Sequence, residues 1–285
     1  MALVAALASC FIRQLTLAVI GGTIIQAAMY KLFKRTHHPG TFEIQMAGAC
    51  DPGRSRDHNE DAISIQEDDG RGYYLAVVCD GMGGHNAGEV ASAVAIQTIS
   101  KYLSENFGKV SNEVLLEAAF AMASDAIDAQ AELNPDARGM GCTCVMVMGV
   151  RDHIWVAWAG DSRCYQVREG ELSQLSTDHT VVQELVEQNL ITPEQAAVHP
   201  YRGRISRCLG HGKNKGNPTI REFPFPLGTN VMLCSDGLSD VLRDEEITAL
   251  VGQRDVRSSA RRLIEAANGA GGPDNISAIV MRRVV

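Results

Sequence analysis

The chain has 285 residues, and 45% of them are apolar, which is enough for one sizeable hydrophobic core. Its net charge is −8, and residues 1–40 carry four basic and no acidic side chains, so the remainder carries −12. An acidic body argues against nucleic-acid binding, which needs a basic surface. Several of the eight cysteines lie inside apolar runs, where they act as small buried side chains, and this indicates a reducing, cytosolic compartment.

The N-terminal segment differs in composition from the rest. From Gln14 to Tyr30 there are 17 residues without a formal charge, followed by basic residues. This length is at the lower limit for a membrane span, and the basic flank and all that follows would then face the cytoplasm. Residues 1–36 are therefore a candidate anchor to the inner membrane, without which the protein would be soluble and cytoplasmic. A later start, at Met29 or Met46, and a signal peptide are the alternatives, although the missing early charges argue against the latter.

After residue 40, short apolar runs between turns predict strands, and longer runs with helical spacing predict helices. The predicted strands are 42–50, 61–66, 73–79, 141–150, 153–159, 164–167, 172–175, 219–223, 230–234 and 275–282. The predicted helices form two pairs, 87–106 with a helix that Ser111 caps, and 244–251 with 255–267. In the first pair, Val90 and Met122 are expected to face inward with the other apolar residues of their stripes. The order of elements indicates an α+β layered sandwich over residues 41–285, not a doubly wound parallel sheet.

The most informative pattern is the position of acidic residues at the ends of apolar strands. Asp80, Asp161 and Asp236 each follow an apolar run and lie beside a glycine, and Asp274 opens the last strand. A single Asp-Gly is common in ordinary turns, so the set of four carries the prediction. Four clustered carboxylates would repel one another unless a cation lay between them. Oxygen ligands alone favour Mg²⁺ or Mn²⁺ over zinc.

A polar loop precedes the second predicted strand and contains Arg56, Glu60 and Asp61. The two adjacent acids would point to opposite faces of a strand, so one could reach a metal while the other orients its neighbours. An arginine in such a loop suits bidentate binding of phosphate oxygens. Taken alone, this stretch is also compatible with a solvated charged loop.

Six short motifs follow one another along the chain: Arg56-x-x-Asn59-Glu60-Asp61, Asp80-Gly81-Met82-Gly83-Gly84-His85, Gly141-x-Thr143, Gly160-Asp161-Ser162-Arg163, Ser235-Asp236-Gly237-Leu238 and Gly272-Pro273-Asp274-Asn275. Their order and spacing, over residues 42–284, resemble the signature blocks of the bacterial branch of the metal-dependent Ser/Thr protein phosphatase (PPM) family. One block alone is weak support, but six in order are very specific.

The resemblance implies a four-layer αββα sandwich, two antiparallel sheets flanked by helix pairs, with metals at one end. It implies that Asp80 bridges two Mn²⁺ or Mg²⁺ ions and that the Gly81 carbonyl binds one of them. The remaining implied ligands are Asp236 and Asp274 for the first ion, Glu60 and Asp61 for the second, and Asp161 with Asp236 for a third, weaker ion. Arg56 would hold the substrate phosphate, and residues 177–216 fall where the family has its flap, a mobile segment beside the active site.

The implied activity is hydrolysis of phosphoserine and phosphothreonine in proteins by a metal-activated water, opposing a bacterial Ser/Thr kinase. Eukaryotic relatives place a proposed general acid, histidine, where this chain has Met82. His85 is the nearest candidate for that role, and a metal-bound water is the alternative. Three other functions stay open: a pseudoenzyme that keeps the fold only, a metal-dependent nuclease, against which the acidic body argues, and a hydrolase of small phosphomonoesters.

Overall fold

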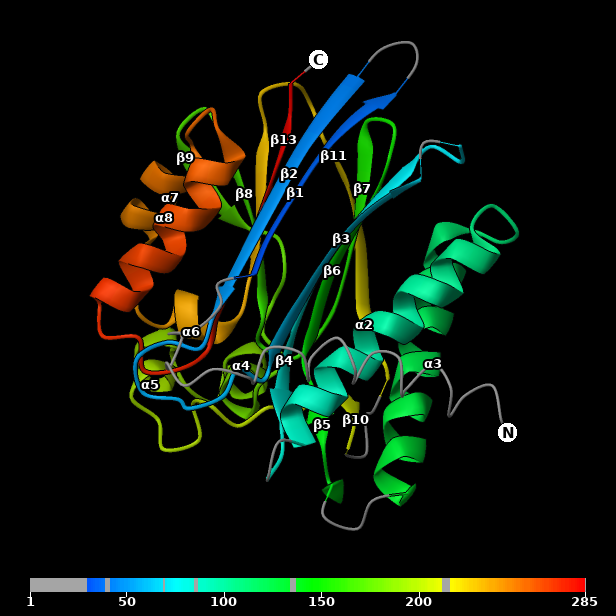
Figure 1. Ribbon diagram of the computed structural model, residues 1–285. Coiled ribbons are helices and arrows are strands. Elements are labelled where there is room, and N and C mark those ends of the chain that lie inside the picture. Colours follow the sequence, from blue (N-terminus) through cyan, green and yellow to red (C-terminus); the bar gives the residue numbers. More distant parts are fainter. Residues whose placement is uncertain are drawn as a thin grey trace, which may run out of the picture.

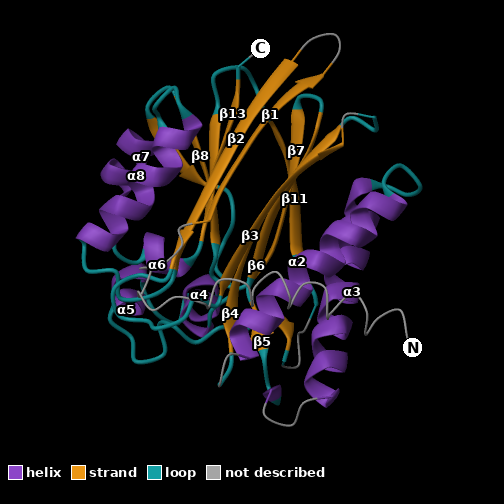
Figure 2. Cartoon of the chain, in the orientation of Figure 1, coloured by secondary structure: helices purple, strands orange, loops and turns teal. Residues whose placement is uncertain are grey.

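Two antiparallel β-sheets lie face to face, and pairs of helices cover their outer faces (Figures 1 and 2). The computed structural model describes residues 30–38, 42–68, 70–84, 87–133, 137–211 and 216–284. One outer layer consists of α2 (Ala87–Asn106) and α3 (Asn112–Leu133), and the other of α7 (Asp244–Val251) and α8 (Val256–Gly269). This arrangement is the α+β, αββα sandwich that the sequence predicts.

Each sheet consists of strands that are far apart in the chain. The first sheet has the order β1 (Tyr30–His38), β2 (Phe42–Asp51), β13 (Ile276–Arg283), β12 (Asn230–Cys234), β8 (Arg163–Arg168) and β9 (Glu171–Gln174). The second has the order β10 (Leu209–Gly210), β5 (Gly141–Cys142), β4 (Tyr73–Met82), β6 (Cys144–Val150), β7 (His153–Ala159) and β11 (Thr219–Pro224), and β3 (Asp61–Asp68) also pairs with β4. Every pairing is antiparallel, so hairpins and helix pairs can connect the strands.

Strand β4 is buried on both of its faces and is apolar along most of its length. Tyr74, Ala76 and Val78 belong to the core between the two sheets. The residues between them, Leu75 and Val77, belong to the core beneath α2 and α3. Successive side chains of a strand point to opposite faces, so a strand buried on both sides needs a continuous apolar run.

The face that α2 turns to the sheet includes several small residues. Ala91 and Ala95 are fully buried, whereas Val90 is 40% exposed and Met122, on α3, is 48% exposed. The predicted inward positions of Val90 and Met122 are therefore wrong. The buried face of α2 combines these alanines with Ile99 and Leu103, so Val90 and Met122 lie outside buried stripes that hold both small and large side chains.

The first sheet begins before residue 41, where the sequence predicts the start of the sandwich. Strand β1 pairs along its whole length with β2, from Tyr30 opposite Cys50 to His38 opposite Phe42. Of the uncharged run 14–30 within the candidate anchor, only Tyr30 lies within the described residues. In the part of the chain that the structure describes, no helix has the length and apolar character needed to cross a membrane.

The seven cysteines within the described residues are all buried, and none of these seven forms a disulfide bond. Cys79 and Cys144 are both fully buried in the core beneath α2 and α3. They therefore act as small apolar side chains, as their positions in apolar runs predict.

The antiparallel topology brings the acidic motifs to one end of the sandwich. The last residues of one strand lie beside the first residues of its neighbour, and Asp61 at the start of β3 is directly opposite Asp80 near the end of β4. Strand β12 ends at the same edge and leads into α6 (Asp236–Ser239), while Asp274 lies just before β13. The short helices α4 (Val181–Glu187) and α5 (Pro193–Ala197) lie within residues 177–216, the predicted flap, and near this end (Figure 1).

Candidate metal centre

Asp61 is the most deeply buried carboxylate of the candidate centre. Asp61 is only 7% exposed, and its Oδ2 atom accepts a hydrogen bond of 2.7 Å from the Ser235 hydroxyl. Its Oδ1 atom is buried and has no hydrogen-bond partner. Burial, followed by the negative charges of Asp236 and Asp274, raises the pKa of Asp61 to about 7, although hydrogen bonds from serine hydroxyls oppose the shift.

Asp80 faces Asp61 across the β3–β4 pair and is surrounded by other acids. Burial raises the pKa of Asp80 well above its ordinary value, and the charges of Asp61, Asp236 and Asp161 add to this effect. The Asp80 and Asp236 side chains also lie close enough to interact directly. Two carboxylates this close repel each other unless a proton or a cation lies between them.

Asp236 and Asp161 complete the buried part of the cluster. Asp236 begins α6, and its Oδ1 atom is buried without a hydrogen-bond partner. Its pKa is raised by burial and by the charges of Asp240 and Asp274. The pKa of Asp161 is raised to about 7, mainly by burial and then by the charges of Asp236 and Asp178. Every acid of the predicted ligand set therefore lies within electrostatic reach of another.

Arg56, Glu60 and Asp274 form the outer rim. The Arg56 Nη2 atom donates a hydrogen bond of 2.8 Å to Asp274 Oδ2, and the two side chains are 52% and 37% exposed. The pKa of Glu60 is raised by burial, which the Arg56 charge opposes and the Asp274 charge reinforces. An ion pair this exposed contributes about 1 kcal/mol or less, so Arg56 is free to exchange Asp274 for another anion.

Asn275 ties this rim to the sheet, a role that the sequence motif did not reveal. Its Oδ1 atom accepts a hydrogen bond from the Glu60 amide, and its Nδ2 atom donates to the carbonyls of Pro52 and His58. The loop that carries Arg56 and Glu60 is therefore held on both sides by one amide side chain. Ser235 acts similarly, since it donates to Asp61 and accepts from the Ser277 amide.

Thr143 connects the two strand ends that carry Asp80 and Asp161. Its Oγ1 atom accepts a hydrogen bond from the Asp80 amide and forms another, of 2.7 Å, with the Ser162 hydroxyl. Its own amide donates to the Asp80 carbonyl. The neighbouring Gly160 has a φ of 116°, and a Cβ atom there would lie 2.6 Å from Thr143 Cβ, so only glycine fits.

Gly81 lies where three backbone segments meet. A Cβ atom at this position would lie 2.1 Å from the Gly88 carbonyl oxygen and 2.6 Å from that of Glu60. The Gly81 amide donates to the Glu60 carbonyl, which fixes the start of β3 against the end of β4. Glycine is thus required for the close approach of the strand end to α2.

The donor set fits hard divalent cations. It consists of carboxylates and a backbone carbonyl, and it includes two buried carboxylate oxygens, on Asp61 and Asp236, that have no hydrogen-bond partner. No three acidic, histidine or cysteine side chains among the described residues already stand in the geometry of a closed ligand set. A cation held by these oxygens would offset the repulsion among the acids.

The sequence-predicted ligands Glu60, Asp61, Asp80, Gly81, Asp161, Asp236 and Asp274 are thus gathered at one end of the sandwich, with Arg56 at their rim. His85 lies outside the described residues, and its role as general acid stays a prediction. The supporting residues Ser235, Asn275 and Thr143 belong to the sequence motifs, but no pattern in the sequence assigns their partners.

Comparison with known proteins gives concordant matches. The family model described as "Protein phosphatase 2C" matches residues 53–280. The chain is 40% identical to the serine/threonine protein phosphatase PstP of Mycobacterium tuberculosis over 84% of the chain and 45% of that protein, so it spans about half of this relative's length. It is 33% identical to the serine/threonine phosphatase stp of Listeria innocua over 82% of the chain and 93% of that protein.

A solved structure shares the fold. The catalytic domain of the serine/threonine protein phosphatase PstP, in complex with two manganese ions, superposes with a TM-score of 0.75 at 37% identity. The match covers 86% of this chain and all of that one. The similarity therefore extends over the whole sandwich, including the end at which the acids gather.

Proposed function

Since the chain belongs to the protein phosphatase 2C family, we propose that it removes phosphate from phosphoserine and phosphothreonine residues of proteins. The observation that carries the proposal is the cluster of mutually repelling, buried carboxylates at one end of the sandwich. Such a cluster is unfavourable without cations, so a protein that had lost the metal chemistry would have no physical reason to keep it.

The proposed cofactors are Mn²⁺ or Mg²⁺ ions, two in number with a third, weaker one. The proposed ligands are the Gly81 carbonyl and the carboxylates of Glu60, Asp61, Asp80, Asp161, Asp236 and Asp274. The similarity to a phosphatase domain that binds two manganese ions supports this assignment. When bound, the ions would activate a water molecule for attack on phosphorus and neutralise the charge of the phosphoryl group.

The chain's own residues would bind and orient the reacting groups. Arg56 would release Asp274 and hold the non-bridging phosphate oxygens, because its guanidinium is exposed at the rim and its ion pair is weak. Ser235 would keep the Asp61 carboxylate oriented through its 2.7 Å hydrogen bond. Asn275 would hold the loop that carries Arg56 at a fixed distance from the acids. Proton donation to the leaving alkoxide by His85 is part of the proposal.

A direct test uses the full-length chain with p-nitrophenyl phosphate and a phosphothreonine peptide, in EDTA, Mg²⁺ or Mn²⁺, beside Asp236→Asn. Phosphate release that requires the metal and is lost in the variant would support the enzyme and its site together. A folded chain that binds Mn²⁺ but does not turn over either compound would support the pseudoenzyme instead. Turnover of the small ester alone would point to a small-molecule phosphatase.

Two finer proposals concern partners and location. The protein would act on targets of a Ser/Thr kinase, because its substrates can arise only from protein phosphorylation. Anchoring to the inner membrane through residues 14–30 is supported by their 17 uncharged positions. Fractionation of cells that express the full chain, compared with a chain that begins at Met29, would test the anchor, and recovery of both forms in the soluble fraction would refute it.

A further inference from the structure

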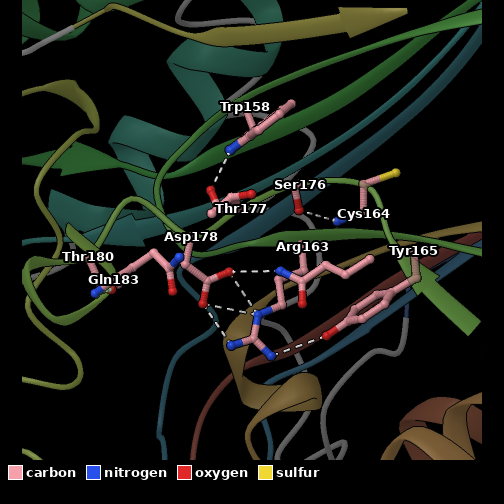
Figure 3. A network of polar contacts seen from close by, with 10 residues as sticks. Trp158, Arg163, Cys164, Tyr165, Ser176, Thr177, Asp178, Thr180 and Gln183 are labelled. Atoms are coloured by element: carbon pink, nitrogen blue, oxygen red, sulfur yellow. Dashed lines mark hydrogen bonds and ion pairs between the residues drawn. The ribbon is translucent and has the colours of Figure 1, made fainter. Parts of the chain in front are cut away.

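An ion pair joins the strand that follows Asp161 to the beginning of the flap (Figure 3). Arg163 is the first residue of β8, and Asp178 lies in the flap two residues before Thr180, which caps α4. The Arg163 Nε atom donates to both carboxylate oxygens of Asp178, at 2.9 and 3.1 Å, and Nη2 donates to Oδ2 at 2.7 Å. The pair thus links the strand that follows the candidate metal ligand Asp161 to a segment of the flap.

This ion pair differs from the exposed pairs elsewhere on the surface. The Arg163 and Asp178 side chains are 26% and 16% exposed, respectively. The remaining Arg163 nitrogen, Nη1, donates to the Tyr165 hydroxyl, and Gln174 donates a further hydrogen bond to Asp178. A bidentate, partly dehydrated pair in which each Arg163 nitrogen donates a hydrogen bond holds both side chains in one geometry, which a flexible surface pair does not.

The residues on either side of Asp178 are fastened to the same strands. The Trp158 indole donates a hydrogen bond of 2.7 Å to the Thr177 carbonyl, and the Ser176 hydroxyl accepts one from the Cys164 amide (Figure 3). The His179 amide donates to the Gly160 carbonyl, and the Gly160 amide donates back to His179 Nδ1. Residues 176–179 are therefore bonded, one after another, to residues 158–164, which include Asp161.

The returning end of the flap is held through the same residues. The Ser206 amide donates to the His179 carbonyl, and the Val181 amide donates to the Arg204 carbonyl. Both ends of the segment that carries α4 and α5 thus meet at residues 179–181. We call residues 176–181 and 204–206 the flap stem.

We propose that Arg163 and Asp178 are positioning residues for the reaction: their ion pair makes the flap stem and the Gly160–Asp161 turn one rigid unit. A displacement of the flap would then move the Asp161 carboxylate relative to Asp80 and Asp236, which belong to other strands. The inference rests on the proposed function for its catalytic consequence, but the rigidity itself does not depend on activity.

The test compares three variants of the full-length chain. Arg163→Lys keeps the charge but cannot form the bidentate pair, and Asp178→Asn removes the acceptor charge. Arg168→Lys is the matched control, because Arg168 lies on the same strand in an ion pair with Glu169 whose side chains are 55% and 81% exposed. Each variant is examined by hydrogen exchange of the backbone amides, by calorimetric titration with Mn²⁺, and by kcat and KM on a phosphothreonine peptide.

In the first two variants, we expect the amides of His179, Val181 and Ser206 to exchange about tenfold faster or more, because opening the stem no longer requires breaking the pair. We expect the weakest Mn²⁺ affinity to fall about tenfold, with a similar fall in kcat and a smaller change in KM. Arg168→Lys should match the wild type in every measurement. The double variant Arg163→Lys/Asp178→Asn should be no worse than the worse single variant, since both changes break one interaction.

Two results would overturn the proposal. If kcat falls while exchange and Mn²⁺ binding stay at wild-type values, Arg163 acts on the substrate and not through the stem. If exchange accelerates while Mn²⁺ binding and kcat do not change, the stem is not coupled to Asp161. A wild-type chain without turnover would refute the proposed function instead, and exchange with Mn²⁺ titration would still decide the coupling.

Discussion

Replacing Asp61 with asparagine should stabilise the metal-free protein while abolishing its activity. The pKa of Asp61 is raised from an ordinary 3.8 to about 7 in the folded chain. At pH 8 both the folded and the unfolded chain are ionised at this position, and a shift of roughly three pKa units corresponds to about 4 kcal/mol of lost stability. Asparagine removes the charge but retains an oxygen that can accept the Ser235 hydrogen bond.

The net gain is smaller because the new amide group buries N–H donors without an acceptor, which costs about 1–3 kcal/mol. We therefore expect Asp61→Asn to raise the free energy of unfolding by about 1–3 kcal/mol at pH 8 in EDTA. The sign follows from proton binding. Between about pH 4 and pH 7 the folded wild type holds more protons than the unfolded chain, so its stability falls as the pH rises. The advantage of the variant should therefore shrink toward pH 5 and reverse at pH 8 when Mn²⁺ is added.

Urea denaturation at pH 5 and pH 8, in EDTA and in Mn²⁺, measures these differences. Asp125→Asn is a suitable control, because Asp125 is an exposed residue of α3 and its replacement should change stability by about 0.5 kcal/mol or less. A variant that is less stable than the wild type at pH 8 in EDTA would refute the reasoning, and so would a stability difference that does not depend on pH.

Three further predictions concern the rim and the strand ends. Asn275→Ala leaves the Glu60 amide and two carbonyls without their Asn275 partner. It should therefore lower the free energy of unfolding by about 2 kcal/mol in urea and reduce kcat/KM on a phosphopeptide more than tenfold. Wild-type values in both assays would show that other contacts hold the loop. Gly81→Ala would place a Cβ atom 2.1 Å from the Gly88 carbonyl oxygen and so displace the Gly81 backbone, whose carbonyl is a candidate ligand. Mn²⁺ titration should therefore show the loss of at least one tight site. An unchanged titration would contradict the close packing. Arg56→Ala should change the free energy of unfolding by about 1 kcal/mol or less, because its ion pair is exposed. It should lower kcat/KM on a phosphopeptide by at least about tenfold. An unchanged kcat/KM would show that Arg56 does not bind the substrate phosphate.

The strands and the acids at their ends could be predicted because their signals are local. A strand such as β4 is buried on both faces and must be apolar throughout, and the Asp-Gly pairs mark where such runs end. The ligand roles are implied only by the resemblance of the six ordered motifs, and they stay predictions.

The remaining features depend on contacts that the sequence does not encode locally. Ser235 and Asp61 are 174 residues apart, so their hydrogen bond appears only once the two sheets have formed. Strand β1 was missed because its basic residues follow an uncharged run, which is also the pattern of a membrane boundary. The prediction for Val90 is wrong because this residue lies one position before the buried stripe that Ala91, Ala95 and Ile99 form at four-residue spacing.

The candidate ligands come from separate segments between Glu60 and Asp274, so only a fragment that spans most of the chain could contain the whole site. Ions that bind only the complete fold stabilise it by mass action, by about 2.7 kcal/mol when their concentration is a hundred times the Kd. Unfolding and release of the ions are then one event, and proteases that cleave unfolded chains compete with the ions for the protein. A cell that runs short of these cations would lose the protein itself along with its turnover, so its abundance would follow the ion supply.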